Sequence, residues 1–484
     1  MLNKSIANVF AAACFFITTS ASAQEKWTIQ KCVDYANENN LALKINNLTI
    51  KSNESTLKQS EMSRLPNLNG SMGQGWNYGF SVNPATNQIV NTQVWSNNYG
   101  LNSSVTLFNG GNITNTIKQN ANNVEVSKQD YERAKNDLIL NVLNSYLQIV
   151  LNKELISVAK VQLQNTQEQL DRTLKLIEGG RLAEVNKYDL ISQKANDELR
   201  IVTAENNLSI AELRLKQLLQ LQVDEPFAID IPQFADPDEN IALTSVAETY
   251  STAEGTQPMI KVADLQVKSA IYGIDIAKAN YYPTLSLNGN ANTRFSSAST
   301  RIPTTFAPIT DIVPTRSFVG QVIPTDPEKF IYTQFTRSTG FEDGSYLSLL
   351  EQNLGYAVSL NLQIPIFNRY QVKNAVGQAT IQHQRTTLQA QQTRNQLRQT
   401  IEQSYIDAKA AAKSFAANKI RANALTESTK AAEQRFNLGA INIVEYTLSK
   451  NNLAIAQTDM VRTKYEYLFR LKVLDFYMGR ELKF

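Results

Sequence analysis

Residues 141–180 read NVLNSYLQIVLNKELISVAKVQLQNTQEQLDRTLKLIEGG, and this stretch decides how the rest of the chain is interpreted. Apolar residues recur in it at an unbroken seven-residue spacing: Val142, Ile149, Ile156, Leu163, Leu170 and Ile177. Such a row forms one narrow seam along a long helix. A weaker row, Leu147, Leu151, Val158 and Val161, falls on the opposite side by the helical period of about 3.6 residues. The pattern predicts a helix with neighbours on two opposite sides.

The chain contains this helix twice. An offset of 259 residues carries the first row onto Ile401, Ala408, Phe415, Ala422, Thr429 and Phe436. Nearer the start of each copy the offset is 217, because Leu65-Pro66-Asn67-Leu68 corresponds to Tyr282-Pro283-Thr284-Leu285. The second copy therefore carries a 42-residue insertion between its proline and the strand that ends at Phe367. Any fold proposed for this chain must therefore contain two copies of the same structural unit.

Residues 1–23 predict a cleaved secretory signal, with Lys4, an apolar run and a small-residue Ala21-Ser22-Ala23 end. The alternative of an N-terminal membrane anchor needs an apolar run of about 20 residues, and this run is shorter. A lipoprotein anchor at Cys14 is a weaker alternative. After cleavage Cys32 is the only cysteine, so no intrachain disulfide is expected. The net charge of +3 is spread along the chain, and no nucleic-acid partner is indicated.

Each copy has the same order of elements: helix, strand, strand, long helix, returning helix. The first repeat, 24–225, is expected to have strands at about 67–81 and 98–108, a long helix at about 112–178 and a returning helix at about 183–221. An equatorial linker is expected at 226–257. The second repeat, 258–484, is expected to have strands at about 284–295 and 354–366, a long loop at about 296–353, a long helix at about 368–437 and a returning helix at about 441–478.

The four expected strands alternate between two kinds of side chain. One face is apolar and aromatic and is expected to face lipid: Trp76, Tyr78, Phe80, Tyr99, Phe295 and Tyr356. The other is small and polar and is expected to face a lumen: Asn67, Asn69, Asn77, Asn102, Asn288, Asn290 and Asn361. Alternation over about 10 residues is typical of a transmembrane β-barrel strand. A soluble antiparallel sheet with one buried face is the alternative.

Four strands do not close a barrel in a membrane, because an open edge leaves backbone groups without partners in lipid. The chain is therefore expected to assemble. A dimer would give about eight strands with a filled interior, whereas a trimer would give about twelve and leave a lumen. The Asn, Ser and Gly face favours a water-filled lumen and hence the trimer.

The doubled layout resembles the TolC-type outer-membrane efflux proteins, the outer membrane factor family. The resemblance is carried by Leu65-Pro66-Asn67-Leu68, by Ile364-Pro365-Ile366-Phe367, and by 435–445 with the pattern Arg-Phe-Asn-Leu-Gly followed by Ile-Val-Glu. It implies an α+β membrane protein, a homotrimer with a twelve-stranded β-barrel in the outer membrane and a long α-helical barrel in the periplasm. It also implies a channel-tunnel for tripartite efflux or type I secretion. Its partners would be outer-membrane lipid, a periplasmic adaptor (membrane fusion protein) and an inner-membrane RND or ABC transporter.

The resemblance also implies two functional regions. Glu445 falls at an acidic position near the family's periplasmic aperture, and Glu184 is the nearest acid in the first copy, although both also fit ordinary solvated carboxylates. Leu448 and Ile441 depart from the family's polar closure. The hairpin tips are expected to contact the adaptor, through Gly179, Gly180, Arg435, Phe436, Asn437, Leu438 and Gly439.

An enzyme is not indicated. His383 is the only histidine, and no Ser/His/Asp or metal-ligand spacing appears, so no catalytic residue, cofactor or metal site is expected. The alternative function is an exported coiled-coil structural protein or adhesin without a pore. The sequence does not identify an exported substrate or the class of pump.

Overall fold

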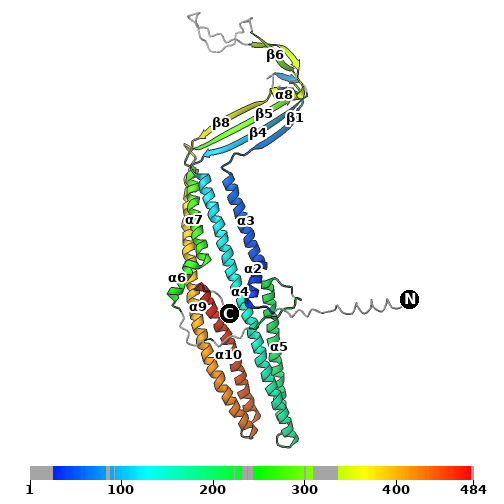
Figure 1. Cartoon of the computed structure of the whole chain (residues 1–484), viewed down its shortest axis with the longest axis vertical. Helices are drawn as coiled ribbons and strands as arrows, with labels where there is room; N and C mark the ends of the chain where they lie inside the picture. The colour runs from blue at the N-terminus through cyan, green and yellow to red at the C-terminus, as the bar shows by residue number, and fades with distance from the viewer. Residues whose placement is uncertain are drawn as a thin grey trace, which may run out of the picture. The chain divides into compact units, whose positions relative to one another are not determined.

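The computed structural model describes residues 26–82, 88–91, 93–222, 224–231, 237, 244–298, 301–308 and 336–480 (Figure 1). The expected signal segment, 1–23, lies outside these residues. The chain divides into two compact units. One consists of Met1–Thr56, Asn120–Ile271 and Ile381–Phe484, and the other of Leu57–Gln119 and Tyr272–Thr380.

Two long helical hairpins contain the duplicated seam. Their helices are α4 (Asn112–Glu178), α5 (Asn186–Leu219), α9 (Gln371–Asn437) and α10 (Ile443–Tyr477). Figure 1 shows α4 beside α5 and α9 beside α10. The first-copy row is fully buried at Val142 and Ile149, and half-buried at Leu163 and Ile177. The second-copy row from Ile401 to Phe436 is buried at every member. The heptad row thus lies where the helices pack.

Large side chains also pack between α9 and α10. Ala411 and Phe415 of α9 pack against Tyr467, which is fully buried on α10. Among the described residues, no helix combines the length and the apolar composition needed to cross a membrane.

The shorter helices also occur in two copies. The first copy consists of α2 (Ile29–Asn39) and α3 (Leu41–Met62), and the second of α6 (Val246–Thr256) and α7 (Pro258–Ala279). Each pair is interrupted by one buried residue in extended conformation, Asn40 or Gln257, and these are 217 positions apart. The N-caps of α2 and α6, Thr28 and Ser245, have the same offset.

The helical stretch before Pro66 thus consists of two helices separated at Asn40. The segment 226–257, expected to be a linker with minor structure, contains α6. Its beginning is also attached to the core, because Ile229 forms a bridge with Trp27 and Tyr146 donates a hydrogen bond to the carbonyl of Asp230.

Four antiparallel strands form one sheet in the order β1-β4-β5-β8. They are β1 (Asn69–Asn77), β4 (Val94–Phe108), β5 (Thr284–Ser296) and β8 (Gly355–Gln363). The register places Met72 opposite Tyr99, and Leu287 opposite Leu360, on one face. On the other face Asn69 is opposite Asn102, which is opposite Asn290. Because directly opposed residues share a face, the two expected sets of side chains are segregated by the sheet.

The outer ends of the strands differ from the expectation. Gly79, at φ 96°, separates β1 from β2 (Phe80–Val82), which pairs with β3 (Ile89–Asn91) in a separate hairpin. Tyr78 and Phe80 therefore do not belong to the four-stranded sheet. The expected loop at 296–353 contains β6 (Arg301–Pro308), β7 (Thr336–Asp343) and α8 (Tyr346–Gln352), and its middle, 309–335, lies outside the described residues.

Phe295 lies on the apolar face, and its side chain is only 6% exposed, because it packs against Trp95 and against Tyr346 of α8. Tyr356 on the same face is 85% exposed. The covering of the apolar face by α8 was not expected from the sequence.

The close packing of the turn from β4 into α4 can be tested. Gly110 and Gly111 both have positive φ, at 64° and 85°. A Cβ on Gly110 would lie 2.6 Å from the Ala279 carbonyl oxygen, whereas a Cβ on Gly111 has no heavy atom nearer than 3.8 Å. Both Ala substitutions strain the backbone, but only Gly110→Ala also overpacks, which costs about 1–3 kcal/mol more. Thermal unfolding followed by circular dichroism should show the lower midpoint for Gly110→Ala; equal midpoints would contradict this packing.

Candidate functional site

Both hairpins end in the same kind of turn. After α4, Arg181 N–H donates to the Leu176 carbonyl at 2.9 Å, and after α9, Ala440 N–H donates to the Arg435 carbonyl at 2.8 Å. Gly180 and Gly439 supply the left-handed residue that this helix ending requires. The tip residues expected to contact an adaptor thus lie in two equivalent turns, and Leu438 is largely exposed in the second.

Glu445 lies in the first turn of α10. Its backbone N–H donates to Oδ1 of the N-cap Asn442 at 2.8 Å, and its carboxylate lies 3.9 Å from Arg435 Nη1. Both side chains of this pair are exposed. A carboxylate also interacts favourably with a helix N-terminus. Glu445 is therefore an exposed charge with a cation beside it, and it helps to begin α10.

Glu184 lies in the other hairpin turn and is paired within its own segment. Lys187 donates a hydrogen bond to its carboxylate, and this contact holds the pKa of Glu184 below its ordinary value. The structure thus places the two expected aperture acids, Glu184 and Glu445, in different hairpins. Each of them is paired with a basic side chain of its own hairpin.

Close to the tips, the two hairpins contact each other. Phe436 of α9 stacks on Tyr446 of α10, with ring centres 5.3 Å apart and planes at 9°. Leu170 of α4 and Leu190 of α5 belong to the same apolar cluster. Arg172 of α4 reaches across to α9, where its Nη1 lies 3.2 Å from Asn437 Oδ1 and 3.6 Å from Glu433. The expected tip residues Phe436 and Asn437 thus also join the hairpins.

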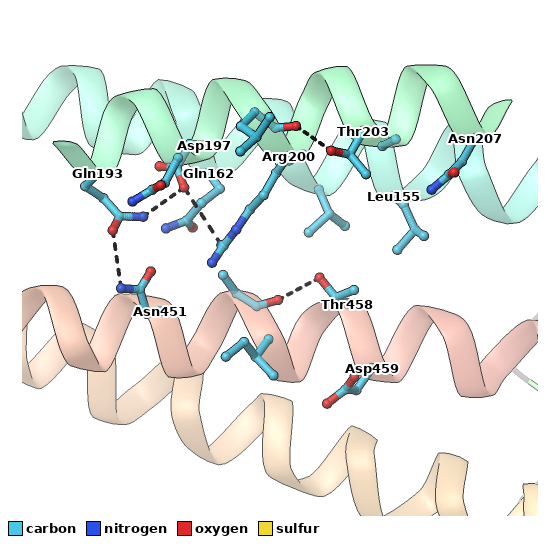
Figure 2. Close-up of a pocket in the computed structure, with 17 residues that line it drawn as sticks. Leu155, Gln162, Gln193, Asp197, Arg200, Thr203, Asn207, Asn451, Thr458 and Asp459 are labelled. Atoms are coloured by element: carbon cyan, nitrogen blue, oxygen red, sulfur yellow. Dashed lines mark hydrogen bonds and ion pairs between the residues drawn. The ribbon is translucent and has the colours of Figure 1, made fainter. Parts of the chain in front are cut away.

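Further along the hairpins, a buried polar network connects α4, α5 and α10, and Figure 2 shows part of it, with Gln193, Asp197 and Asn451. Asp197 of α5 is buried and accepts hydrogen bonds from Thr166 Oγ1 at 2.7 Å and from Gln193 Nε2 at 2.9 Å. Lys450 of α10 donates to the same Thr166 Oγ1 at 3.3 Å. Asn451, also of α10, donates to Gln193 Oε1 at 3.2 Å. Two chains of hydrogen bonds therefore run from one hairpin to the other.

Lys450 brings a positive charge into this packed region. Its side chain is buried, and its Nζ lies 5.8 Å from the centre of the Tyr446 ring. Burial lowers the pKa of Lys450, while the carboxylates of Asp197, Glu433 and Glu168 act against that shift. Asp197 has a second cation nearby, since Arg200 Nη1 lies 3.8 Å from its Oδ1. Asp197 is thus near one cation on its own helix, Arg200, and near a second on the other hairpin, Lys450.

The network forms one end of an open groove of about 520 Å³ among α4, α5 and α10. Figure 2 shows Gln193, Asp197 and Asn451 at this end, and Thr203 and Asn207 towards the other. Among the described residues, no group of three or more His, Cys, Asp or Glu side chains is arranged to hold a metal ion. The hydrogen bonds of this network hold the two hairpins in one relative position.

Sequence reasoning did not identify Asp197, Lys450, Gln193 or Thr166. One signal was available: Thr166 and Thr173 follow seam members by three positions, and both are fully buried. A polar residue beside an apolar seam needs a buried partner. The sequence alone does not say which helix supplies it.

The network predicts an asymmetry between single and double substitutions. Lys450→Met removes one buried charge and its hydrogen bond to Thr166, and leaves Asp197 with Arg200 as its neighbouring cation, so we expect a loss of about 1–3 kcal/mol. Lys450→Met combined with Asp197→Asn removes both charges and keeps an acceptor for Thr166, so part of the loss should be recovered. Lys194→Met on α5 is the control, because Lys194 is partly exposed and pairs with Glu198 of its own helix. Thermal midpoints measured by circular dichroism test this order; a double variant less stable than Lys450→Met would contradict it.

Comparison with known proteins shows which family has this architecture. The model of the outer membrane efflux protein family matches residues 32–220 and 249–480, and the second match begins within α6. The fusaric acid resistance protein FusA of Burkholderia cepacia is 24% identical over 229 residues, which are 46% of this chain and 42% of FusA. The outer membrane protein TolC of Escherichia coli K12 is 24% identical over 340 residues, 70% of this chain and 60% of TolC. The alignments thus span less than two thirds of either relative.

Solved structures agree in fold. The crystal structure of CusC has a TM-score of 0.74 at 16% identity, covering 94% of this chain and 92% of CusC. The outer membrane protein VceC of Vibrio cholerae has a TM-score of 0.71 at 13% identity, covering 94% and 97%. The family match extends over most of the residues that build both repeats. The chain is a member of the outer membrane efflux protein family, an outer-membrane protein that extends into the periplasm.

Proposed function

We propose that this chain forms the outer-membrane duct of a tripartite efflux or type I secretion system. Three copies would assemble into a twelve-stranded β-barrel that continues as a periplasmic α-helical barrel. The duct would be a passive conduit, opened when a periplasmic adaptor and an inner-membrane RND or ABC transporter engage it. Membership of the efflux family supports this proposal at the level of an outer-membrane efflux channel.

The observation that carries the proposal is the four-stranded sheet. It has β1 and β8 at its edges, each paired on one side only among the described strands. Its apolar face is open over much of its area, with Tyr356 and Val358 more than three-quarters exposed. In lipid, unpaired edges leave backbone groups unsatisfied, so the edges need strands from other copies. The opposite face, with Asn102 and Asn290 in register, suits water.

The length of the apolar face suits an outer membrane. The stretch from Leu285 to Phe295 spans about 33 Å at about 3.3 Å per residue. With a strand tilt of about 40°, this corresponds to a band of about 25 Å, the height typical of outer-membrane barrels.

The long helices also support an assembly of several copies. The second apolar row is buried on α4 at Leu147 and Leu151. On α9 Ile406, which corresponds to Leu147, is 60% exposed, and Ile420, which corresponds to the exposed Val161, is 69% exposed. A helix with one buried seam and one open apolar row fits a wall in which the next copy covers the open row.

The hairpin tips would be the adaptor contact, and Glu445 of three copies would surround the periplasmic aperture. Glu184 is a weaker candidate for the aperture, because Lys187 pairs with it. A ring of carboxylates at a narrow opening attracts cations. The proximity of Arg435 to Glu445 would reduce this effect in the resting protein.

Planar-bilayer recording of the purified protein tests the proposed function. Discrete single-channel conductance steps are expected, because the lumen-facing Asn, Ser and Gly side chains would line a water-filled pore. A protein that is correctly folded by circular dichroism but conducts no ions would support the alternative, an exported coiled-coil structural protein or adhesin.

Two opposite substitutions test the aperture. Glu445→Ala should reduce cation selectivity, measured as the reversal potential in a salt gradient, because it removes a negative charge from each copy. Arg435→Ala should increase cation selectivity, because it removes the neighbouring positive charge. Glu178→Ala, at the end of α4, is the matched control for loss of an acidic residue near a tip. Unchanged reversal potentials in both test variants would exclude Glu445 from the aperture.

A further inference from the structure

The helix α8 covers one end of the apolar face of the sheet. Tyr346 accepts a hydrogen bond from Asn97 Nδ2 at 2.7 Å, and its hydroxyl lies 2.8 Å from that of Tyr99. Thr293 donates to the Leu350 carbonyl, and Leu349 is buried. Asn97, Tyr99 and Thr293 belong to the same face, because the register pairs Tyr99 with Thr293 and Asn97 with Phe295. The contacts fix α8 on the face that we propose to be lipid-facing.

The side of α8 that points away from the sheet is mainly polar. By the helical period of about 3.6 residues, residues 347, 348, 351 and 352 lie opposite the sheet contacts. Glu351 and Gln352 are exposed, and Leu347 is the one large apolar residue there, 75% exposed. A carboxylate such as Glu351 is costly within hydrocarbon. The composition therefore suits the boundary between lipid and water better than the membrane interior.

Aromatic rings gather at the same end of the sheet. Trp95, Phe295 and Tyr346 form a cluster with ring centres 4.6 to 6.4 Å apart. Trp95 and Phe295 lie near the strand ends remote from the β4–α4 turn. Tyr and Trp are enriched where a membrane meets water, since each has an apolar ring and a polar group. The cluster thus marks this end of the sheet as a membrane boundary.

Directly beside α8, the apolar face is hollowed. The hollow has a volume of about 430 Å³, and its apolar lining includes Met72, Leu101, Ala291 and Leu354. Gly70, opposite Leu101 on this face, contributes no side chain, which leaves room among large residues. A shallow apolar hollow that opens to the lipid side fits a hydrocarbon chain.

We propose that α8 is an interfacial helix that lies at the outer-leaflet boundary of the membrane, and that the hollow beside it holds an acyl chain of an outer-leaflet lipid. The inference rests on the proposed membrane-embedded barrel and adds the position of its outer boundary. Glu351 and Gln352 would lie at the level of the lipid headgroups, Leu347 would insert among the upper parts of the acyl chains, and Val358 would lie deeper.

Spin labels on single cysteines test this order of depth in liposomes. Cys32 is buried, and its burial raises the pKa of the thiol to about 12, so it should not be labelled in the folded protein. Labels would replace Leu347, Glu351 and Val358, with Ser359 on the polar face as the matched control. The ratio of collision with oxygen to collision with a water-soluble nickel complex should decrease in the order 358, 347, 351, with position 359 accessible to the nickel complex.

Three outcomes are distinguishable. The expected order supports the interfacial helix. If position 358 is lipid-exposed but positions 347 and 351 are equally exposed to water, the membrane barrel stands and the role of α8 is overturned. If position 358 is as water-accessible as position 359, the lipid-facing assignment fails, and both proposals fail with it.

Acyl-chain binding in the hollow is tested separately, by filling the hollow with a larger side chain. In a background with Trp27, Trp76 and Trp95 replaced by Phe, Ala291→Trp places the one indole reporter in the hollow, whereas Gly289→Trp on the same face of β5 places it outside. Brominated lipid should quench the Ala291→Trp variant less when an additional bulky residue, Gly70→Leu, excludes the lipid chain from the hollow. Quenching of the Gly289→Trp control should not change with Gly70→Leu. Equal quenching of the Ala291→Trp variant with and without Gly70→Leu would overturn acyl-chain binding in the hollow.

Discussion

The rest of the proposed assembly depends on the two open edges of the four-stranded sheet. Within the described chain, β1 and β8 pair on one side only, and the sheet between them has one apolar and one polar face. Water would solvate such edges, but lipid does not. The proposed barrel would therefore need further strands, and copies of the same chain are the nearest source. The sheet order makes β1 of one copy the natural neighbour of β8 of the next.

The helical unit must likewise hold separate parts together, and it does so with polar contacts as well as apolar ones. Its seams are one residue wide, so each hairpin has little apolar area to hold it against the other. Buried rows such as Ile401 to Phe436 stabilise the individual hairpins, while Lys450, Thr166 and Asp197 connect one hairpin with the other. Polar connections of this kind are specific in geometry and weak in net stabilisation. This combination is suited to hairpins that hold a defined position and are displaced by a partner.

The sequence predicted the elements whose pattern is local and repeated. The seven-residue row defined α4, and alternation defined the faces of β4, β5 and β8. It did not predict the break at Asn40, because an extended residue between two helices leaves the apolar period almost unchanged. It missed α8, whose seven residues are too few for a period, and the Asp197–Lys450 network, whose partners lie on helices far apart in sequence. Contacts between segments that are far apart in the sequence can be identified only in the folded structure.

The most direct test of closure by three copies is disulfide linking of neighbouring edge strands. Ser71 on β1 and Ser359 on β8 are exposed on the polar face, and cysteine pairs scanned from these positions along the two strands would meet only between copies. After oxidation in membranes, denaturing gels should show a ladder that stops at the trimer for at least one register. A ladder that extends past three chains, or no linked species in any register, would contradict the account.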